Sequence, residues 1–375
     1  MKSLAYRAPL LSAFLAAAVL TQAQTKVAAP PPRHRAELAF VANQSGDDLS
    51  AYQIKPSGAL LAVPGSPFAV GSSANSVTVV PSGRFAYVAD VIPGGISGFS
   101  VAENGVLTPV PGSPFATPDG TAFVTTDPSG RFLYALNCGD NCSGSGPGSI
   151  AAFNIDQQTG SLTPVAGSPF TAGQFPYSLA IDPTGHFAYV ANAGADSLSS
   201  YAVDSQSGAL TQVGLPVAAG TRPLSVAVDP WGQFVYAANT GSSDVSAFAI
   251  NFDGSLRKVI GSPFPAGAFT AGVAASHAGK FVVVAAESGA YVYLVDASGA
   301  LHLVADSPVA AGLGPNGVSI DPDDGLVYIV NAGSANVSAY KFNNQSGKLT
   351  PVVGSPFPAG TFAAGITTAA ARTHE

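Results

Sequence analysis

Residues 177–192 read Tyr-Ser-Leu-Ala-Ile-Asp-Pro-Thr-Gly-His-Phe-Ala-Tyr-Val-Ala-Asn, a pattern that recurs along the chain. Its first half alternates large and small residues and ends in Asp182-Pro183-Thr184-Gly185, with Pro and Gly at the positions that a type I turn favours. Its second half, from His186 to Asn192, is rich in residues that favour strands. The stretch therefore predicts two strands joined by a tight turn.

The second of these strands has seven copies along the chain. Successive copies lie 47, 47, 55, 47, 47 and 45 residues apart and end at Asn43, Asp90, Asn137, Asn192, Asn239, Ala286 and Asn331. A Gly-Ser-Pro-Phe motif keeps the same spacing, at 65, 112, 167, 261 and 354, with weakened copies at 214 and 306. Seven units of this length, each with room for four short strands, are typical of a β-propeller. We therefore predict an all-β fold over residues 37–370, a seven-bladed β-propeller with four antiparallel strands per blade.

The strand count also predicts how the ring closes. The first unit begins at its second strand, residues 37–43, and lacks an innermost strand. The last unit is followed by an extra strand-like segment, residues 365–369. We expect the C-terminal segment to pair with the N-terminal strand, which leaves no unpaired strand edge at the centre of the ring.

The first 23 residues have the pattern of an export signal. Lys2 and Arg7 accompany an apolar stretch from Ala8 to Leu20, and Thr21-Gln22-Ala23 offers small residues for cleavage. This apolar run is shorter than the roughly 20 residues that cross a bilayer. We expect cleavage near Ala23, a periplasmic or secreted protein with no membrane span after cleavage, a flexible leader over 24–36 and a tail over 371–375.

Charge and cysteine content narrow the function classes. The net charge of −7 gives no basic surface for nucleic acid. We find no zinc motif, phosphate loop or EF-hand loop and predict neither a metal nor a cofactor. The two cysteines, Cys138 and Cys142, lie in the one unit with about eight extra residues, and export to an oxidising compartment predicts that they form a disulfide.

Candidate ligand-binding residues are those that depart from the repeat near the expected channel mouth. Arg222 is the one basic residue just before an innermost strand, and it could bind a carboxylate or phosphate. Asn75, Tyr177 and Asn316 take the equivalent place in other units and suit a ligand rich in hydroxyl groups. The alternatives are an inter-blade contact for Arg222 and a solvated rim for the other three.

Three carboxylates are candidate general bases. Glu287 follows the second strand whose final Asn is lost, Asp90 replaces that Asn in the second unit, and Asp119 precedes the third innermost strand. For Asp90 the alternative is that it simply replaces Asn as an isostere.

The repeated motifs resemble those of a known family. They are the Tyr-Val-Ala-Asn strand ends, the Asp-Pro-x-Gly turns and the Leu-Thr-Pro hairpins at 107–109, 162–164 and 349–351. This set is similar to that of the seven-bladed lactonase family, which includes 6-phosphogluconolactonase-type propellers and relatives with Tyr-Val-Thr-Asn repeats. The resemblance implies a propeller, and in members with lactonase activity it implies His, Glu and Arg around the channel mouth. Here no His-rich stretch precedes an innermost strand.

Two function classes follow. The first is an exported binding or scaffold module, expected to be a monomer, whose channel mouth or rim recognises a small hydroxylated or anionic ligand, a polysaccharide or an envelope protein. The alternative is a sugar-lactone hydrolase in which Arg222 holds the substrate and Glu287, Asp90 or Asp119 activates water.

Overall fold

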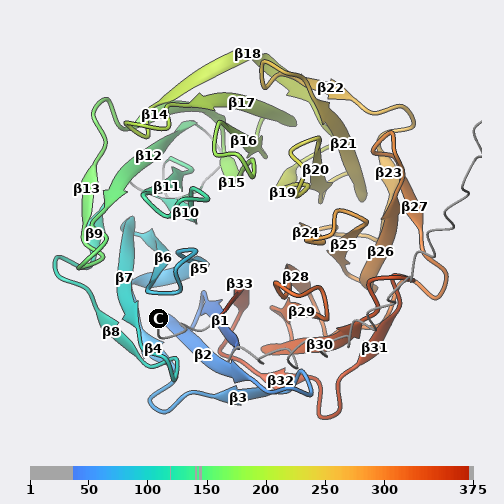
Figure 1. The fold of residues 1–375 in the computed structure, drawn as a ribbon, viewed down its shortest axis with the longest axis horizontal. Coiled ribbons are helices and arrows are strands. Elements are labelled where there is room, and N and C mark those ends of the chain that lie inside the picture. Colours follow the sequence, from blue (N-terminus) through green and yellow to red (C-terminus); the bar gives the residue numbers. More distant parts are fainter. Residues whose placement is uncertain (1–36, 119, 140–141, 143–145, 371–375) are drawn as a thin grey trace, which may run out of the picture. The chain divides into compact units, whose positions relative to one another are not determined.

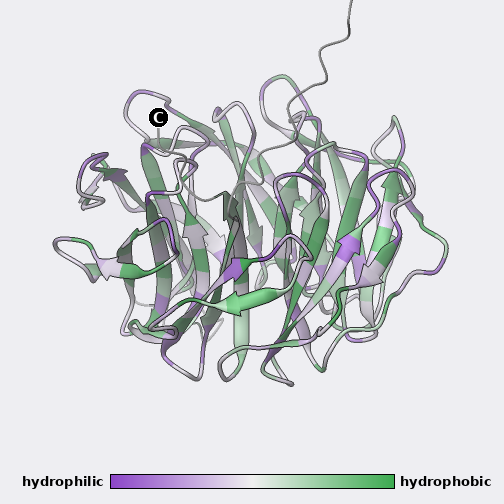
Figure 2. Ribbon diagram, turned by 60° about the horizontal axis from the view of Figure 1, so that its bottom comes forward, coloured by the Kyte–Doolittle hydropathy of each residue, from purple (hydrophilic) through white to green (hydrophobic). Residues whose placement is uncertain are grey.

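The computed structural model describes residues 37–118, 120–139, 142 and 146–370. Within this range, seven antiparallel sheets form a ring around a central channel (Figure 1). Hydrophobic residues are concentrated in the strands, whereas hydrophilic residues gather in the loops (Figure 2). The fold is thus the predicted all-β, seven-bladed β-propeller. The predicted leader, signal and tail segments lie outside the described residues.

Each blade has four main strands. The innermost strands are β5 (Ser72–Val79), β10 (Thr121–Thr126), β15 (Pro176–Ile181), β19 (Pro223–Val228), β24 (Gly272–Ala275), β28 (Pro315–Ile320) and β33 (Ala363–Ala370). The second strands are β6 (Phe85–Ile92), β11 (Phe132–Asn137), β16 (Phe187–Asn192), β20 (Phe234–Asn239), β25 (Phe281–Ala286), β29 (Leu326–Asn331) and β1 (Glu37–Asn43). The third strands are β7 (Gly95–Val101), β12 (Pro147–Ile155), β17 (Ser197–Val203), β21 (Asp244–Ile250), β26 (Gly289–Val295), β30 (Asn336–Phe342) and β2 (Asp48–Ile54).

The outer strands are short in six blades and long in one. They are β8 (Leu107–Pro109), β13 (Leu162–Pro164), β18 (Leu210–Ala218), β22 (Leu256–Lys258), β27 (Leu301–Leu303), β31 (Leu349–Pro351) and β3 (Leu60–Ala62). In five blades the Gly-Ser-Pro-Phe motif adds a further short strand beside the third strand: β4 (Phe68–Ala69), β9 (Phe115–Ala116), β14 (Phe170–Gln174), β23 (Phe264–Pro265) and β32 (Phe357–Pro358).

The ring closes as the strand count predicts. Strand β33 pairs antiparallel with β1, from Glu37 opposite Ala370 to Asn43 opposite Ala363. The innermost strands then contact their neighbours all the way round, including β33 with both β28 and β5. The first blade therefore combines strands β1, β2 and β3, from the start of the described chain, with β33 from its end.

The tyrosine of the repeated strand joins neighbouring blades. Its buried hydroxyl donates to the carbonyl of the glycine in the next blade's outer hairpin, as from Tyr87 to Gly160 at 2.8 Å and from Tyr134 to Gly208 at 3.0 Å. The same bond from Tyr328 to Gly58 links the last blade to the first. This contact gives the Tyr-Val-Ala-Asn repeat a structural reason.

The asparagine that ends the repeated strand joins strands within a blade. In four blades its amide nitrogen donates at 2.9 Å to a serine on the third strand, and the pairs are Asn43–Ser50, Asn192–Ser199, Asn239–Ser246 and Asn331–Ser338. Because these groups are buried, each bond satisfies polar atoms that water does not reach.

Candidate functional site

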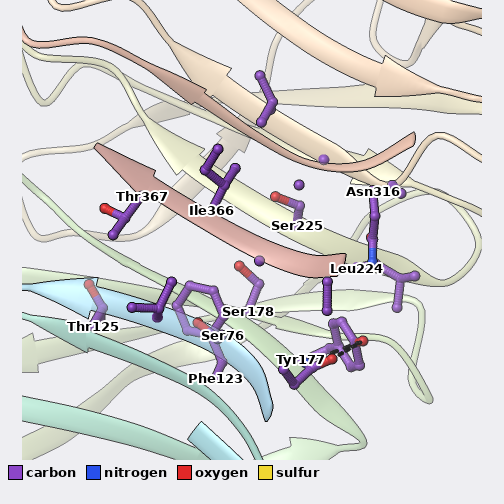
Figure 3. Close-up of a pocket in the computed structure, with 18 of the residues that line it drawn as sticks. Ser76, Phe123, Thr125, Tyr177, Ser178, Leu224, Ser225, Asn316, Ile366 and Thr367 are labelled. Atoms are coloured by element: carbon purple, nitrogen blue, oxygen red, sulfur yellow. Dashed lines mark hydrogen bonds between the residues drawn. The ribbon is translucent and has the colours of Figure 1, made fainter. Parts of the chain in front are cut away.

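A cavity of about 270 Å³ lies along the innermost strands of all seven blades (Figure 3). Its polar lining consists of hydroxyl and amide side chains, among them Ser76, Thr125, Ser178, Ser225 and Thr367, and the remainder is aliphatic apart from Phe123 and Tyr177. None of the described residues that line it carries a formal charge at neutral pH. The cavity therefore offers neutral hydrogen-bonding groups on an apolar wall.

In four blades an irregularity in strand pairing places a residue on the lining at one end of this cavity. The pairing of several innermost strands with their second strands shifts register near the start, as between Pro176 and Ser178. The residue at the shift is Asn75 in β5, Tyr177 in β15, Leu224 in β19 and Asn316 in β28, and all four line the cavity. A β-bulge commonly re-aims a side chain in this way.

The structure places three of the four predicted ligand-binding residues on this lining. Tyr177, Leu224 and Asn316 lie toward one end of the channel in Figure 3, with Thr125 and Thr367 toward the other. Asn75 and Tyr177 lie within hydrogen-bond distance, since the tyrosine hydroxyl is 3.4 Å from both side-chain polar atoms of Asn75. Leu224 was not predicted, although it stands at the same place in the repeat.

Burial of Tyr177 has an electrostatic consequence. Desolvation raises the pKa of its hydroxyl, while the hydrogen bond to Asn75 and the positive charge of Arg222 oppose that rise. The amide nitrogen of Asn75 also donates to the carbonyl of Ala122 at 2.7 Å, so the amide is held in place. Tyr177 thus presents a neutral hydroxyl at the mouth.

The disulfide supports this side of the mouth. Cys138 and Cys142 are bonded to each other, and Cys138 packs with Ala122 and Phe175. Tyr177 packs against the same cluster, with its ring centroid 5.7 Å from that of Phe175. The disulfide of the third blade therefore braces the wall that carries Tyr177.

Arg222 lies on the rim outside the cavity lining. Its backbone has a φ of 55°, its N–H donates to Asp196 at 2.7 Å, and its carbonyl accepts from Thr240 at 3.0 Å. The side chain is exposed, and its charge acts on Tyr177. Arg222 is thus available to a ligand that extends from the mouth.

The candidate bases do not converge on the cavity. Glu287 is exposed in the loop after β25, where its N–H donates to Ala268 at 2.8 Å. Asp90 is only 3% exposed and accepts a hydrogen bond from Ser97 at 2.7 Å, in the place that Asn takes in other blades. Burial raises the pKa of Asp90 to about 6. Asp119 lies outside the described residues.

Neither a metal cluster nor a membrane-spanning helix is found among the described residues. Among them, no group of three or more His, Cys, Asp or Glu side chains is placed to hold a metal ion. In the same part of the chain no helix is long and apolar enough to cross a membrane.

Comparison with known proteins agrees with the architecture. A family model described as Lactonase, 7-bladed beta-propeller, matches residues 47–222, 178–267 and 258–363. No curated protein matches the sequence.

Several solved structures share the fold at low sequence identity. A periplasmic gluconolactonase from Pseudomonas aeruginosa has 19% identity and a TM-score of 0.73, with 90% of this chain and 99% of that chain covered. A candidate 6-phosphogluconolactonase from Bacteroides uniformis has 17% identity and a TM-score of 0.74, with 89% and 99% covered. Kuenenia stuttgartiensis hydrazine synthase has 17% identity and a TM-score of 0.59, with 78% and 89% covered, so similar folds carry different chemistry. Through the match to its family model, the chain belongs to the lactonase family of seven-bladed β-propellers.

Proposed function

We propose that this protein binds a small, neutral, hydroxyl-rich molecule of the sugar or sugar-lactone class at the channel mouth. The observation that carries the proposal is the cavity lining, in which Asn75, Tyr177 and Asn316 join serine and threonine hydroxyls without a formal charge. Sugar hydroxyls donate and accept hydrogen bonds, and amide and hydroxyl side chains do the same. The volume of about 270 Å³ is near the lower end of small-molecule pockets, which favours a single sugar unit.

Titration calorimetry tests this proposal with δ-gluconolactone, gluconate and glucose as ligands. Tyr177→Phe removes one hydroxyl from the mouth, and we expect affinity for the neutral ligands to fall about two- to tenfold. Tyr189→Phe is the matched control, because the Tyr189 hydroxyl is buried in a blade and does not line the cavity. If no neutral sugar or lactone binds, or if Tyr189→Phe weakens binding as much as Tyr177→Phe, the proposal is wrong.

Arg222 provides a second test at the same site. Its exposed guanidinium near Tyr177 supports a contact with a carboxylate. We expect Arg222→Ala to weaken gluconate binding by about 1.5–3 kcal/mol and to leave glucose binding unchanged.

Hydrolysis of the bound lactone is the second candidate function. Membership of the lactonase family supports it, as does the exposed carboxylate of Glu287 on the mouth side of the sixth blade. Glu287 would remove a proton from water as the water oxygen attacks the lactone carbonyl. The ring C–O bond would then break, and protonated Glu287 would return the proton to the leaving ring oxygen, which releases the hydroxy acid. Turnover of δ-gluconolactone above the spontaneous rate, abolished in Glu287→Gln with binding retained, would establish hydrolysis.

We also propose that the protein acts outside the cytoplasm. The charge and apolar pattern of residues 1–23 and the paired cysteines support this location. N-terminal sequencing of protein recovered from the cell envelope or medium should begin near residue 24, and an intact N-terminus in the cytosol would contradict the proposal.

A further inference from the structure

One backbone position recurs at the mouth of all seven blades. In five blades the residue just ahead of the innermost strand has a left-handed backbone. In the other two blades the left-handed residue is Ser73, one step into β5, and Phe269, three residues before β24. The seven residues, with their φ angles, are Ser73 (63°), Gly120 (78°), Phe175 (47°), Arg222 (55°), Phe269 (49°), Gly314 (61°) and Phe362 (55°). Glycine adopts this conformation freely, whereas a bulky side chain does so at a cost of order 1 kcal/mol or more.

Three consecutive blades expose large apolar side chains at or beside this position. Phe269 is 64% exposed, Leu313 is 72% exposed and Phe362 is 44% exposed. They precede β24, β28 and β33, which are neighbours in the ring (Figure 1). By contrast, Phe175 in the fourth blade is only 9% exposed, because it packs in the cluster that contains the disulfide. We name Phe269, Leu313 and Phe362 the apolar arc.

The backbone of the apolar arc is tied to the body of each blade. The carbonyl of Phe362 accepts from the N–H of Gln44 at 3.0 Å, and that of Leu313 accepts from Gly333 at 3.0 Å. Beside Phe269, the carbonyl of Ala268 accepts from Glu287 at 2.8 Å. The arc therefore holds its side chains in water on a fixed and, at the two phenylalanines, strained backbone. Neither the exposed side chains of the arc nor the strained backbone of the two phenylalanines stabilises the fold. A role in binding therefore explains them better than packing does.

The arc is close in sequence to the lining of the neutral cavity. Phe269 and Phe362 each stand two residues before a cavity-lining residue, Ala271 and Ala364 respectively. A polar pocket with an apolar lip matches the two faces of a sugar ring, which has hydroxyl groups at its edge and C–H groups on its flat face. An aromatic ring packs well against that C–H face.

We propose that the apolar arc is a second carbohydrate subsite, which stacks the next sugar unit of a neutral oligosaccharide or polysaccharide whose end occupies the channel mouth. The inference rests on the proposed sugar-binding function and deepens it, because it makes the natural ligand a glycan chain. Phe269 and Phe362 provide the stacking surfaces, and Leu313 lies between them in the order of the blades.

Calorimetry with glucose, δ-gluconolactone and neutral glucose disaccharides and trisaccharides of several linkages tests the proposal. We expect at least one oligosaccharide to bind about five- to tenfold more tightly than glucose, the range for an aromatic contact. Phe269→Asn and Phe362→Asn should remove that gain and leave the affinity for glucose unchanged. Asparagine tolerates a left-handed backbone, so these variants should fold. Phe252→Asn is the matched control, because Phe252 is exposed in the hairpin between β21 and β22 and not at the mouth.

The outcomes distinguish the arc proposal from the proposed binding of a single sugar. Glucose binding that is sensitive to Tyr177→Phe, with no gain from added sugar units, would overturn the arc proposal and keep the proposed function. Oligosaccharide binding that is lost in the arc variants, without measurable glucose binding, would support the arc and overturn the single-sugar proposal. A concentration-dependent dimer that the arc variants abolish would assign the arc to self-association and overturn the glycan subsite.

Discussion

The buried carboxylate of Asp90 should destabilise the protein at neutral pH, and Asp90→Asn should relieve this. The side chain is 3% exposed and accepts a hydrogen bond from the Ser97 hydroxyl, and its Oδ1 has no hydrogen-bond partner among the described residues. Gly71 packs so closely that a Cβ atom there would lie 2.6 Å from the Asp90 carboxyl carbon. Burial raises the pKa from 3.8 to about 6.

The sign and size of the effect follow from that pKa. Between about pH 4 and pH 6 the folded chain keeps a proton on Asp90 that the unfolded chain has released, so the free energy of unfolding falls as pH rises. Above pH 6 both states are ionised, and the difference of about two pK units corresponds to about 3 kcal/mol. Asn carries no charge and takes this position in five other blades. Asp90→Asn should therefore be up to about 3 kcal/mol more stable than the parent near pH 7.5 and nearly equal to it near pH 4.

Urea unfolding at several pH values, followed by circular dichroism, measures this difference. Asp323→Asn is the control, because it removes the same charge from an exposed turn residue. A stability difference between Asp90→Asn and the parent that is the same at pH 4 and pH 7.5 would show that the Asp90 charge does not destabilise the fold, as would an equal effect of Asp323→Asn.

Three further predictions concern what holds the ring together. Tyr134→Phe removes a buried inter-blade hydrogen bond and should lower stability by about 1–2 kcal/mol in thermal melts. Tyr189→Phe removes a buried hydroxyl that has no partner among the described residues, so it should be neutral or stabilising in the same melts. A chain that ends before Phe362 lacks β33, which leaves β1 with an unpaired edge. This chain should melt at a much lower temperature than the full chain or aggregate. An equal melting temperature would show that β33 does not close the ring. Replacing both Cys138 and Cys142 by Ser should lower the free energy of unfolding by about 2 kcal/mol. It should also weaken glucose binding, because the disulfide packs in the cluster that supports Tyr177. Unchanged binding would show that the disulfide does not brace the mouth.

The ring could be predicted from the sequence because its determinants are local and repeated. The sequence of each blade contains the residues that end its strands and form its turns. The first blade lacks an innermost strand before β1, which indicates that β33 pairs with β1. The places of Asn75, Tyr177 and Asn316 followed from their common position in the repeat. The raised pKa of Asp90 depends on its burial, which the repeat indicates less directly. The signal for Asp90 was Ser97, seven residues later, because serine stands at this spacing from Asn43, Asn192, Asn239 and Asn331 as well.

The apolar arc escaped prediction for a different reason. A left-handed backbone at Phe269 or Phe362 is fixed by hydrogen bonds around the mouth, and phenylalanine carries no local preference for it. Aromatic residues in a strand-rich chain are ordinarily part of the core, as Phe175 is at the same position of its own blade. Exposure distinguishes the two cases, and exposure is a property of the assembled ring.

The closure of the ring by β33 and β1 also orders the events of folding during synthesis. Strands β1, β2 and β3 of the first blade are synthesised before the other six blades, and its innermost strand is synthesised after them. Until then β1 has an unpaired edge, and the first and last blades are not joined by a shared sheet. The contacts that join the two ends of the ring, including the bond from Tyr328 to Gly58, can therefore form only after the last blade has been made, and they bridge a long sequence separation.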